Sequence, residues 1–373
     1  MRGAVMKSFV HRGQITKVVF GSGTRAGLAT EVEALGRGRA LVLCTPGQTA
    51  QAEEVSEILG ALTAGVFDQA AAHTPVAVTG KAVDAARAAD ADCLVSVGGG
   101  SAIGLGKAVA LRTGLPHLAL PTTYAGSEMT PILGETQDGG KTTRRLPEVL
   151  LDTVVYDVDL TLTLPPHVAA VSGLNAMAHA VESLYAQDGD PLAFLTAGEA
   201  LDALAVALPE ILRDPADTEA RATALYGAWL AGTCLGTVGM ALHHKVCHVL
   251  GGSFDLPHAQ THAVVLPHVV AYNAPAAETA MARISRALPG PDPVGAVFRF
   301  ARGIGAPRAL RDLGMPESGI AEAADLVVRD GYWNPRPVHR DAVRDLLRRA
   351  WAGEPPARAA SGPHYDPTGA RHA

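Results

Sequence analysis

The chain has 373 residues, of which 48% are hydrophobic and 18% charged, and its formal net charge is −6 at pH 7. This is the composition of a folded globular protein, and the length exceeds what one hydrophobic core usually supports, so we expect two domains. The acidic balance and the lack of a basic block argue against nucleic acid as a partner. No apolar run reaches the roughly 18 residues needed to span a bilayer. With no recognisable signal peptide and four cysteines that form no CxxC pair, we expect a cytoplasmic protein with free thiols.

Strand-like and helix-like segments alternate over the first half of the chain. Continuous apolar runs typical of buried strands lie at residues 17–20, 39–45, 64–67, 93–97 and 118–120. Segments with helical periodicity lie between them, at residues 51–62, 76–89 and 102–111. Because apolar strands that alternate with helices are typical of a parallel sheet covered on both faces, we predict an α/β domain over residues 1–158.

Long helical patterns rich in alanine and leucine follow after about residue 158. They cover residues 168–186, 191–212, 218–237, 239–250 and 276–286, and strand-like alternation is almost absent. We therefore predict an all-helical domain over residues 159–352. The segment 353–373 lacks apolar periodicity, and we expect it to be a mobile tail.

A glycine-rich turn follows the predicted strand at residues 93–97. It consists of Gly98, Gly99, Gly100 and Ser101 and leads into a helix. Free N–H groups at a helix N-terminus bind phosphate, although such a turn can also serve tight packing alone. A second polar turn, at residues 121–128, follows the next strand. Since ligands in open α/β sheets lie outside the carboxyl ends of the strands, the two turns together predict phosphate binding in one crevice.

Histidine is concentrated in one short stretch of the second half. Six histidines lie within 26 residues: His243, His244, His248, His258, His262 and His268. Histidine serves as a metal ligand and as a proton carrier near neutral pH. Individual members such as His243 and His268 fit core histidines with satisfied hydrogen bonds, but the cluster as a whole indicates a functional site.

A second pair of polar residues lies upstream of this cluster. Asn175 and His179 are four residues apart, which places them on one face of a helix, one turn from each other. The same spacing relates His244 and His248. The spacing therefore places the two members of each pair on one face of their own helix.

These turns and histidines carry a family resemblance. The chain resembles the group III, iron-dependent type alcohol dehydrogenases in GGGS at 98–101, PTT and SE within 121–128, YDVDLT at 156–161, and the histidine block that ends in LPH at 266–268. Within that family it is more similar to the maleylacetate reductases, through TTYAGSEMTPI, SGLNAMAHAVESLYA, HHKVCHVLGG and PHAQTHAVVLPH. The match extends from about residue 17 to about residue 350.

The resemblance implies a dehydroquinate synthase-like fold. An N-terminal Rossmann-like dinucleotide-binding domain and a C-terminal helical domain would enclose the active site in a cleft, and the family implies a homodimer. Cofactor-binding positions carry over to Gly98, Gly99, Gly100, Ser101, Thr122, Thr123, Ser127 and Thr130. In the metal-dependent relatives an aspartate and three histidines hold the ion, and those positions are occupied here by Asn175, His179, His244 and His258.

The amide at position 175 leads us to expect that no metal is required. A neutral amide oxygen is a poorer ligand for a divalent cation than a carboxylate. We expect a degenerate metal site in which Asn175, His179 and His258 donate hydrogen bonds instead.

The remaining polar residues of the cluster would then bind substrate. We expect His244, His248 and Lys245 to contact carboxylate and enolate oxygens, with His248 as the proton donor. Lys245 also fits an ordinary solvated helix lysine.

The resemblance predicts the reduction of maleylacetate to 3-oxoadipate in the degradation of aromatic compounds. Hydride would add to the conjugated carbon–carbon double bond, and the charge would spread into an enolate that N–H donors stabilise. The predicted strand at 39–45 ends at Cys44 and Thr45 without an acidic residue for the ribose hydroxyls, so we expect NADH to be used and NADPH to be tolerated. We weigh three alternatives: an iron- or zinc-dependent alcohol dehydrogenase, a non-catalytic nucleotide-binding protein, and a lyase of the dehydroquinate synthase type.

Overall fold

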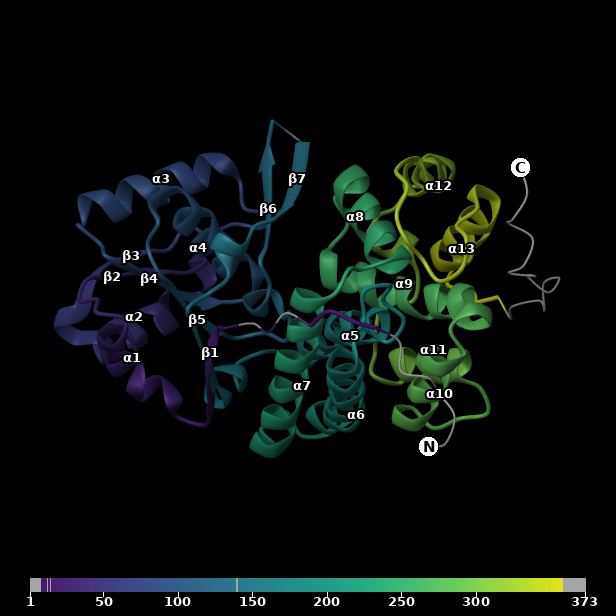
Figure 1. Ribbon diagram of the computed structural model, residues 1–373, viewed down its shortest axis with the longest axis horizontal. Helices are drawn as coiled ribbons and strands as arrows, with labels where there is room; N and C mark the ends of the chain where they lie inside the picture. Colours follow the sequence, from purple (N-terminus) through teal and green to yellow (C-terminus); the bar gives the residue numbers. More distant parts are fainter. Residues whose placement is uncertain (1–7, 12, 14, 139, 358–373) are drawn as a thin grey trace.

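The computed structural model describes residues 8–11, 13, 15–138 and 140–357. An α/β part and a helical part lie side by side along the long axis of the molecule (Figure 1). The last strand of the sheet ends at Asp157 and the first long helix of the helical part begins at Pro166. Most of the predicted tail, residues 358–373, lies outside the described residues.

The α/β part is built on a parallel sheet, as predicted. Its six strands run in the order β1-β8-β5-β4-β2-β3, and every pairing is parallel. The strands are β1 (Lys17–Gly21), β2 (Ala40–Leu43), β3 (Thr63–Phe67), β4 (Cys93–Gly98), β5 (His117–Pro121) and β8 (Thr153–Asp157). All residues of β2, β4, β5 and β8 are buried, as expected for strands that are covered on both faces.

Helices cover the two faces of this sheet. The helices are α1 (Leu28–Ala34), α2 (Thr49–Leu59), α3 (Val76–Ala88) and α4 (Gly100–Thr113). Leu28 of α1 and Val55 of α2 share a core cluster with Val42 of β2, whereas the neighbouring Leu41 packs with Leu105 of α4 in a separate cluster. Because successive strand residues point to opposite faces, α1 and α2 lie on one face and α3 and α4 on the other.

Helix α1, strand β8 and a hairpin of two strands in the first half were not predicted. Strand β8 lies between β1 and β5. An antiparallel hairpin, β6 (Ile132–Gln137) and β7 (Gly140–Arg145), stands apart from the main sheet. Its Glu135 is bound by Arg112 at 2.7 Å and by Arg144 at 2.7 Å, so the hairpin is fastened to α4 by charge rather than by apolar packing alone.

The second half of the chain is helical, as predicted. Its helices are α5 (Pro166–Ser183), α6 (Pro191–Arg213), α7 (Thr218–Thr237), α8 (Leu242–Phe254), α9 (His258–Asn273), α10 (Glu278–Ala287), α11 (Pro293–Gly303), α12 (Gly319–Arg329) and α13 (Arg340–Ala352). Helix α5 packs against α6, α7 and α9, and it is buried continuously over residues 169–183. Polar side chains on this helix therefore face the protein interior.

Helix α6 is long and apolar enough to cross a membrane by length and composition, and α7 with α8, bent by 94°, passes the same test as a pair. Half of the apolar window of α6 is buried inside the protein. Core helices of water-soluble proteins pass this test as well, so these helices are weak evidence for a membrane.

A buried histidine at the start of β5 makes the stability of the α/β part depend on pH. Burial lowers the pKa of His117 to about 3, and Lys107 adds to this shift. The Oγ of Ser96 donates to the Ala102 carbonyl at 3.1 Å and accepts from Nε2 of His117 at 2.7 Å, so the ring is held neutral.

We predict that this histidine makes the protein less stable in acid. Since the pKa in the folded state is below that in the unfolded state, the unfolded chain binds more protons once the pH falls below about 6.5, and stability falls by up to about 1.4 kcal/mol per pH unit. His117→Gln keeps a donor for Ser96 but does not titrate, and it should remove that contribution. Urea unfolding at pH 7.0, 6.0 and 5.0 measures the slope, with the exposed His167 replaced in the same way as control. An unchanged slope in His117→Gln would contradict the assignment.

Candidate active site

The glycine turn after β4 is a point where the backbone must come close to its neighbours. Gly98 has φ +143°, and a Cβ there would lie 2.4 Å from Oε1 of Gln48. A Cβ on Gly99 would lie 2.9 Å from Oγ1 of Thr123. Only glycine fits these two positions, and the cradle that they form is open to an anion such as a phosphate.

Side chains from three strand ends meet at this turn. The amide of Thr122, after β5, donates to the Gly98 carbonyl at 3.1 Å. Gln48, after β2, donates from Nε2 to Oγ1 of Thr122 at 2.8 Å and accepts from Oγ1 of Thr45 at 3.0 Å. The carboxyl ends of β2, β4 and β5 thus form one polar edge, which is where ligands of open parallel sheets bind. Sequence reasoning missed Gln48, although it lies directly after the strand end that we considered for the ribose.

A buried lysine holds the segment after β5 in place. Nζ of Lys107, on α4, donates to the carbonyls of Ser127 and Thr130 at 2.6 Å each, and to Oγ1 of Thr130 at 3.0 Å and the Ile132 carbonyl at 3.1 Å. Burial lowers the pKa of Lys107 to about 7. Two of the predicted cofactor residues, Ser127 and Thr130, are therefore fixed by a lysine that the sequence analysis did not consider. A single lysine among the apolar residues of that helix was the available signal.

The histidines of three helices, α5, α8 and α9, lie together. His179 of α5 and His244 of α8 lie 2.8 Å apart, from Nδ1 to Nε2, and both are buried. His262 of α9 has its ring centre 5.1 Å from that of His244 and 4.3 Å from that of His258. The ring of His248 lies 6.2 Å from that of His244. These residues form what we call the histidine cluster.

Asn175 lies beside His179, and one of its side-chain atoms has no hydrogen-bond partner. Its Nδ2 is 3.3 Å from Nε2 of His179 and 3.4 Å from the Ala125 carbonyl. Its Oδ1 is buried and has no hydrogen-bond partner. An unpartnered buried oxygen costs free energy, so this atom has a lone pair that a ligand or ion could use.

A carboxylate that sequence reasoning missed holds the cluster together. Glu182 is fully buried on α5, and its Oε2 accepts from Nδ1 of His244 at 2.7 Å. Since a carboxylate accepts, the hydrogen of His244 lies on Nδ1 and the lone pair lies on Nε2. The signal was present in the sequence, because Glu182 follows His179 by three residues and so lies on the same face of its helix.

Burial keeps the inner histidines neutral. Desolvation, with the neighbouring His244 ring as the next cause, holds the pKa of His179 well below its ordinary value, and burial does the same for His243 and His262. A neutral imidazole has a nitrogen lone pair that a metal ion can use. The neutral inner histidines thus offer lone pairs to a cation and do not repel it.

The outer predicted residues lie at the edge of the cluster. His248 and His258 are exposed. Nζ of Lys245 forms an ion pair with Asp330 at 3.0 Å and lies 5.8 Å from the centre of the Tyr332 ring. Its charge therefore already has an acidic partner. Substrate binding by Lys245 stays a prediction.

Among the described residues, one group of three histidine, cysteine or acidic side chains has its donor atoms close enough together to be considered for a metal, and it is not the predicted set. Atoms of His243, Cys247 and His262 lie within 4.8 Å of one another, and all three residues are buried. Nε2 of His243 is 3.0 Å from Nδ1 of His262 and 3.7 Å from Sγ of Cys247. Burial holds the pKa of the Cys247 thiol well above its ordinary value, and a cysteine binds a metal as the thiolate, so we assign the group to the packing behind His244.

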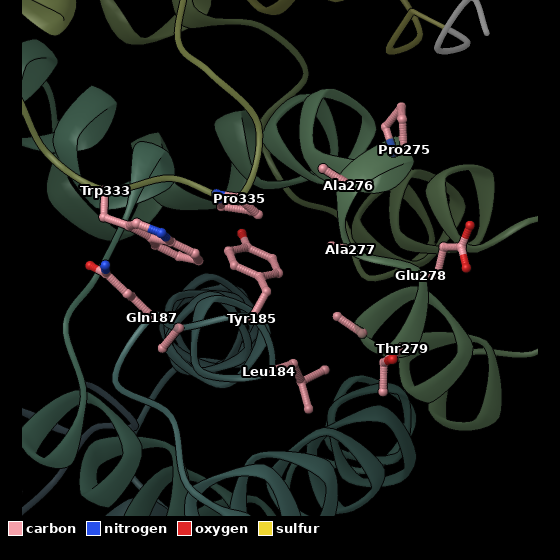
Figure 2. A pocket seen from close by; sticks show the side chains of 12 residues that line it. Leu184, Tyr185, Gln187, Pro275, Ala276, Ala277, Glu278, Thr279, Trp333 and Pro335 are labelled. Atoms are coloured by element: carbon pink, nitrogen blue, oxygen red, sulfur yellow. The ribbon is translucent and has the colours of Figure 1, made fainter. Parts of the chain in front are cut away.

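A cavity of about 560 Å³ opens beyond the end of α5, between this end and the segments around Pro275 and Trp333. Figure 2 shows the Tyr185 ring in this cavity, pointing toward Pro335 beside Trp333. The Tyr185 hydroxyl lies 3.5 Å from Oε1 of Glu182. Tyr185 thus connects the wall of this cavity to the carboxylate that holds His244.

Comparisons with known proteins give the family. Residues 16–158 match the iron-containing alcohol dehydrogenases, and residues 169–351 match the C-terminal part of the Fe-containing alcohol dehydrogenase family. The chain belongs to the iron-containing alcohol dehydrogenase family. The predicted resemblance and fold class are thereby confirmed.

Individual relatives within the family are closer still. The chain is similar to a maleylacetate reductase of Rhizobium sp. (strain MTP-10005), with 53% identity over 94% of this chain and 100% of the relative. A maleylacetate reductase of Burkholderia cepacia is 51% identical over 94% and 100%. The crystal structure of a maleylacetate reductase from Agrobacterium tumefaciens superposes with a TM-score of 0.91 at 53% identity, covering 94% of this chain and 100% of that one.

The expectation that no metal is required is wrong. The family that matches both parts of the chain is iron-containing, and a solved iron-containing alcohol dehydrogenase of Corynebacterium glutamicum is 41% identical over 94% of this chain, with a TM-score of 0.89. The prediction gave too much weight to the loss of one carboxylate. The amide oxygen of Asn175 still offers a lone pair and is buried without a partner, and neutral imidazoles suit iron and zinc. The residues present fit a divalent ion.

We predict that the glycine turn tolerates no side chain. Gly98→Ala would combine a left-handed backbone with a contact 2.4 Å from Gln48, so it should lower the free energy of unfolding by about 1–3 kcal/mol. Gly47→Ala, where a Cβ would meet nothing within 4 Å, is the matched control. Urea unfolding measures both variants, and equal losses in the two would contradict the prediction.

Proposed function

We propose that this protein is a maleylacetate reductase that uses NAD(P)H and a divalent metal ion. The relatives named maleylacetate reductase, which match nearly the full chain at about half identity, carry this proposal. The predicted oxidoreductase function agrees with them. A cytoplasmic location and a homodimer remain our proposals, supported by four buried free cysteines and by the family resemblance respectively.

The metal site would consist of four side chains around the unpartnered oxygen. We assign Asn175, His179, His244 and His258 as the residues that hold the ion, because the first three lie together in the interior and His258 stands on the neighbouring helix α9. A bound divalent ion polarises a ketone oxygen as a Lewis acid. This role suits a substrate with a ketone conjugated to the reacting double bond.

The cofactor would lie along the polar edge of the sheet. The glycines at 98 and 99 let a pyrophosphate approach the backbone, and the N-terminus of α4 adds free N–H groups. NAD(P)H supplies the hydride. Thr122, Thr123, Ser127 and Thr130 stand on the adjacent segment, where we expect them to orient the rest of the cofactor.

The chemistry on the substrate is a conjugate reduction. The substrate carbon β to the ketone receives hydride, the electron pair of the double bond moves to the ketone oxygen as an enolate, and the α carbon then takes one proton. The product is 3-oxoadipate. We assign proton donation to His248, which is exposed on the same face of α8 as His244, and carboxylate binding to the outer cationic and polar side chains, Lys245 included.

The test of this function is the oxidation of NADH with freshly prepared maleylacetate, followed by absorbance. We expect rapid turnover, its loss after prolonged dialysis against a chelator, and its return with Fe2+ or Zn2+. Turnover of simple alcohols without turnover of maleylacetate would contradict the substrate. Full turnover by protein whose metal content has been measured as zero would contradict the metal.

We predict that His248→Ala lowers kcat by about 10²–10⁴-fold, as the loss of a general acid does. The pH profile of kcat should lose the limb that reports the acid. Thr237→Ala, a change at the end of the preceding helix, is the control. A kcat within about threefold of the unmodified enzyme would mean that another group supplies the proton.

We predict comparable kcat/KM values for NADH and NADPH. No acidic residue follows β2 to repel a 2′-phosphate, and the residues there, Thr45 and Gln48, are neutral and bound to each other. Steady-state kinetics with both cofactors measures the ratio. A preference for NADH above about a hundredfold would reveal an acidic contact elsewhere.

A further inference from the structure

Glu182 meets the first turn of a helix to which it does not belong. The first N–H groups of any α-helix have no partner within the helix. Helix α8 has no side chain of its own that caps it, since Ala241 stands at its N-cap. Oε2 of Glu182 accepts from the Ala241 amide at 2.8 Å, and Oε1 accepts from the His243 amide at 2.8 Å. A carboxylate from α5 thus caps α8.

The same carboxylate also fixes a side chain of that turn. Oε2 of Glu182 accepts from Nδ1 of His244 at 2.7 Å. One buried group therefore sets both where α8 begins and how the His244 ring is turned. With the hydrogen held on Nδ1, the Nε2 lone pair points toward His179, 2.8 Å from its Nδ1.

We propose that Glu182 is a positioning residue of the metal site, which presents Nε2 of His244 to the ion; this rests on the metal site of the proposed function. Carboxylates that accept from a metal-bound histidine fix its tautomer and orientation, and their loss commonly weakens metal binding about 10–100-fold. Here the carboxylate also anchors the backbone that carries the ligand. Glu182 alone thus prevents both a shift of the start of α8 and a rotation of the His244 ring.

A cap that served stability alone would have the same backbone contacts. The two roles differ in what they predict for metal affinity. Asp217 offers a matched comparison, because its side chain caps α7 by accepting from the Ala220 amide at 3.0 Å. Tyr185 offers another, since its hydroxyl reaches Oε1 of Glu182 at 3.5 Å from the side of the cavity in Figure 2.

The experiment measures the affinity of the full-length protein for Zn2+ and Co2+ by competition with a chelating dye after removal of bound metal. Glu182→Gln keeps the shape, but its NH2 group cannot accept from N–H donors. We expect the dissociation constant for both ions to rise about 10–100-fold and the visible spectrum of bound Co2+ to change. Asp217→Asn should lower Tm without changing metal affinity, and Tyr185→Phe should leave the affinity unchanged.

The outcomes separate this inference from the proposed metal site. An unchanged affinity in Glu182→Gln, or an equal loss in Asp217→Asn, would overturn the positioning role while the metal site stands. If the unmodified protein binds neither ion, the metal site itself fails.

A second measurement needs no variant. In the 15N-labelled, metal-free protein, two-bond 1H–15N correlations report which ring nitrogen carries hydrogen. We expect His244 to be protonated on Nδ1 and bare on Nε2. The opposite tautomer would overturn the inference, even if Glu182→Gln did not fold.

Discussion

The hydrogen bonds of Glu182 join the two helices on which the site depends. Its carboxylate accepts from the backbone at the start of α8 and from the His244 ring, while Asn175 and His179 precede it on α5. Any movement of α8 relative to α5 would break several of these bonds at once. A buried carboxylate without its donors is costly, and this cost keeps the site in one arrangement.

The edge of the sheet where we expect the cofactor is built differently. There the backbone itself is the binding surface, because Gly98 and Gly99 leave no room for side chains next to Gln48 and Thr123. Lys107 then ties the segment after β5 to α4 through four hydrogen bonds. The protein thus combines a glycine cradle on a parallel sheet with a polar cluster in a helical domain. A reductase needs both, one for the hydride donor and one for the substrate that receives the hydride.

Most strands and helices of the first half were predicted, and the second half was predicted to be helical, but helices α9, α11, α12 and α13 were not placed individually. The apolar runs of β2 and β4 and the helix at Val76–Ala88 were placed within a few residues. Strand β8 was missed although Val154, Val155 and Tyr156 are strand-forming residues, and its position between β1 and β5 depends on pairing that the sequence does not show. The histidines were recognised by type and spacing, but Glu182 acts on a residue 62 positions away, which spacing alone does not reveal. The need for a metal was misjudged because the prediction rested on one substituted ligand position, Asn175, and not on the whole ligand set.

The measurement that tests the central claim most directly is X-ray diffraction from crystals of the protein with iron, recorded on both sides of the iron absorption edge. We predict one anomalous peak per chain, among Oδ1 of Asn175 and the rings of His179, His244 and His258, with Glu182 still bonded to Nδ1 of His244. A peak between His243, Cys247 and His262, or the lack of any peak in crystals of enzyme that is fully active, would contradict the account.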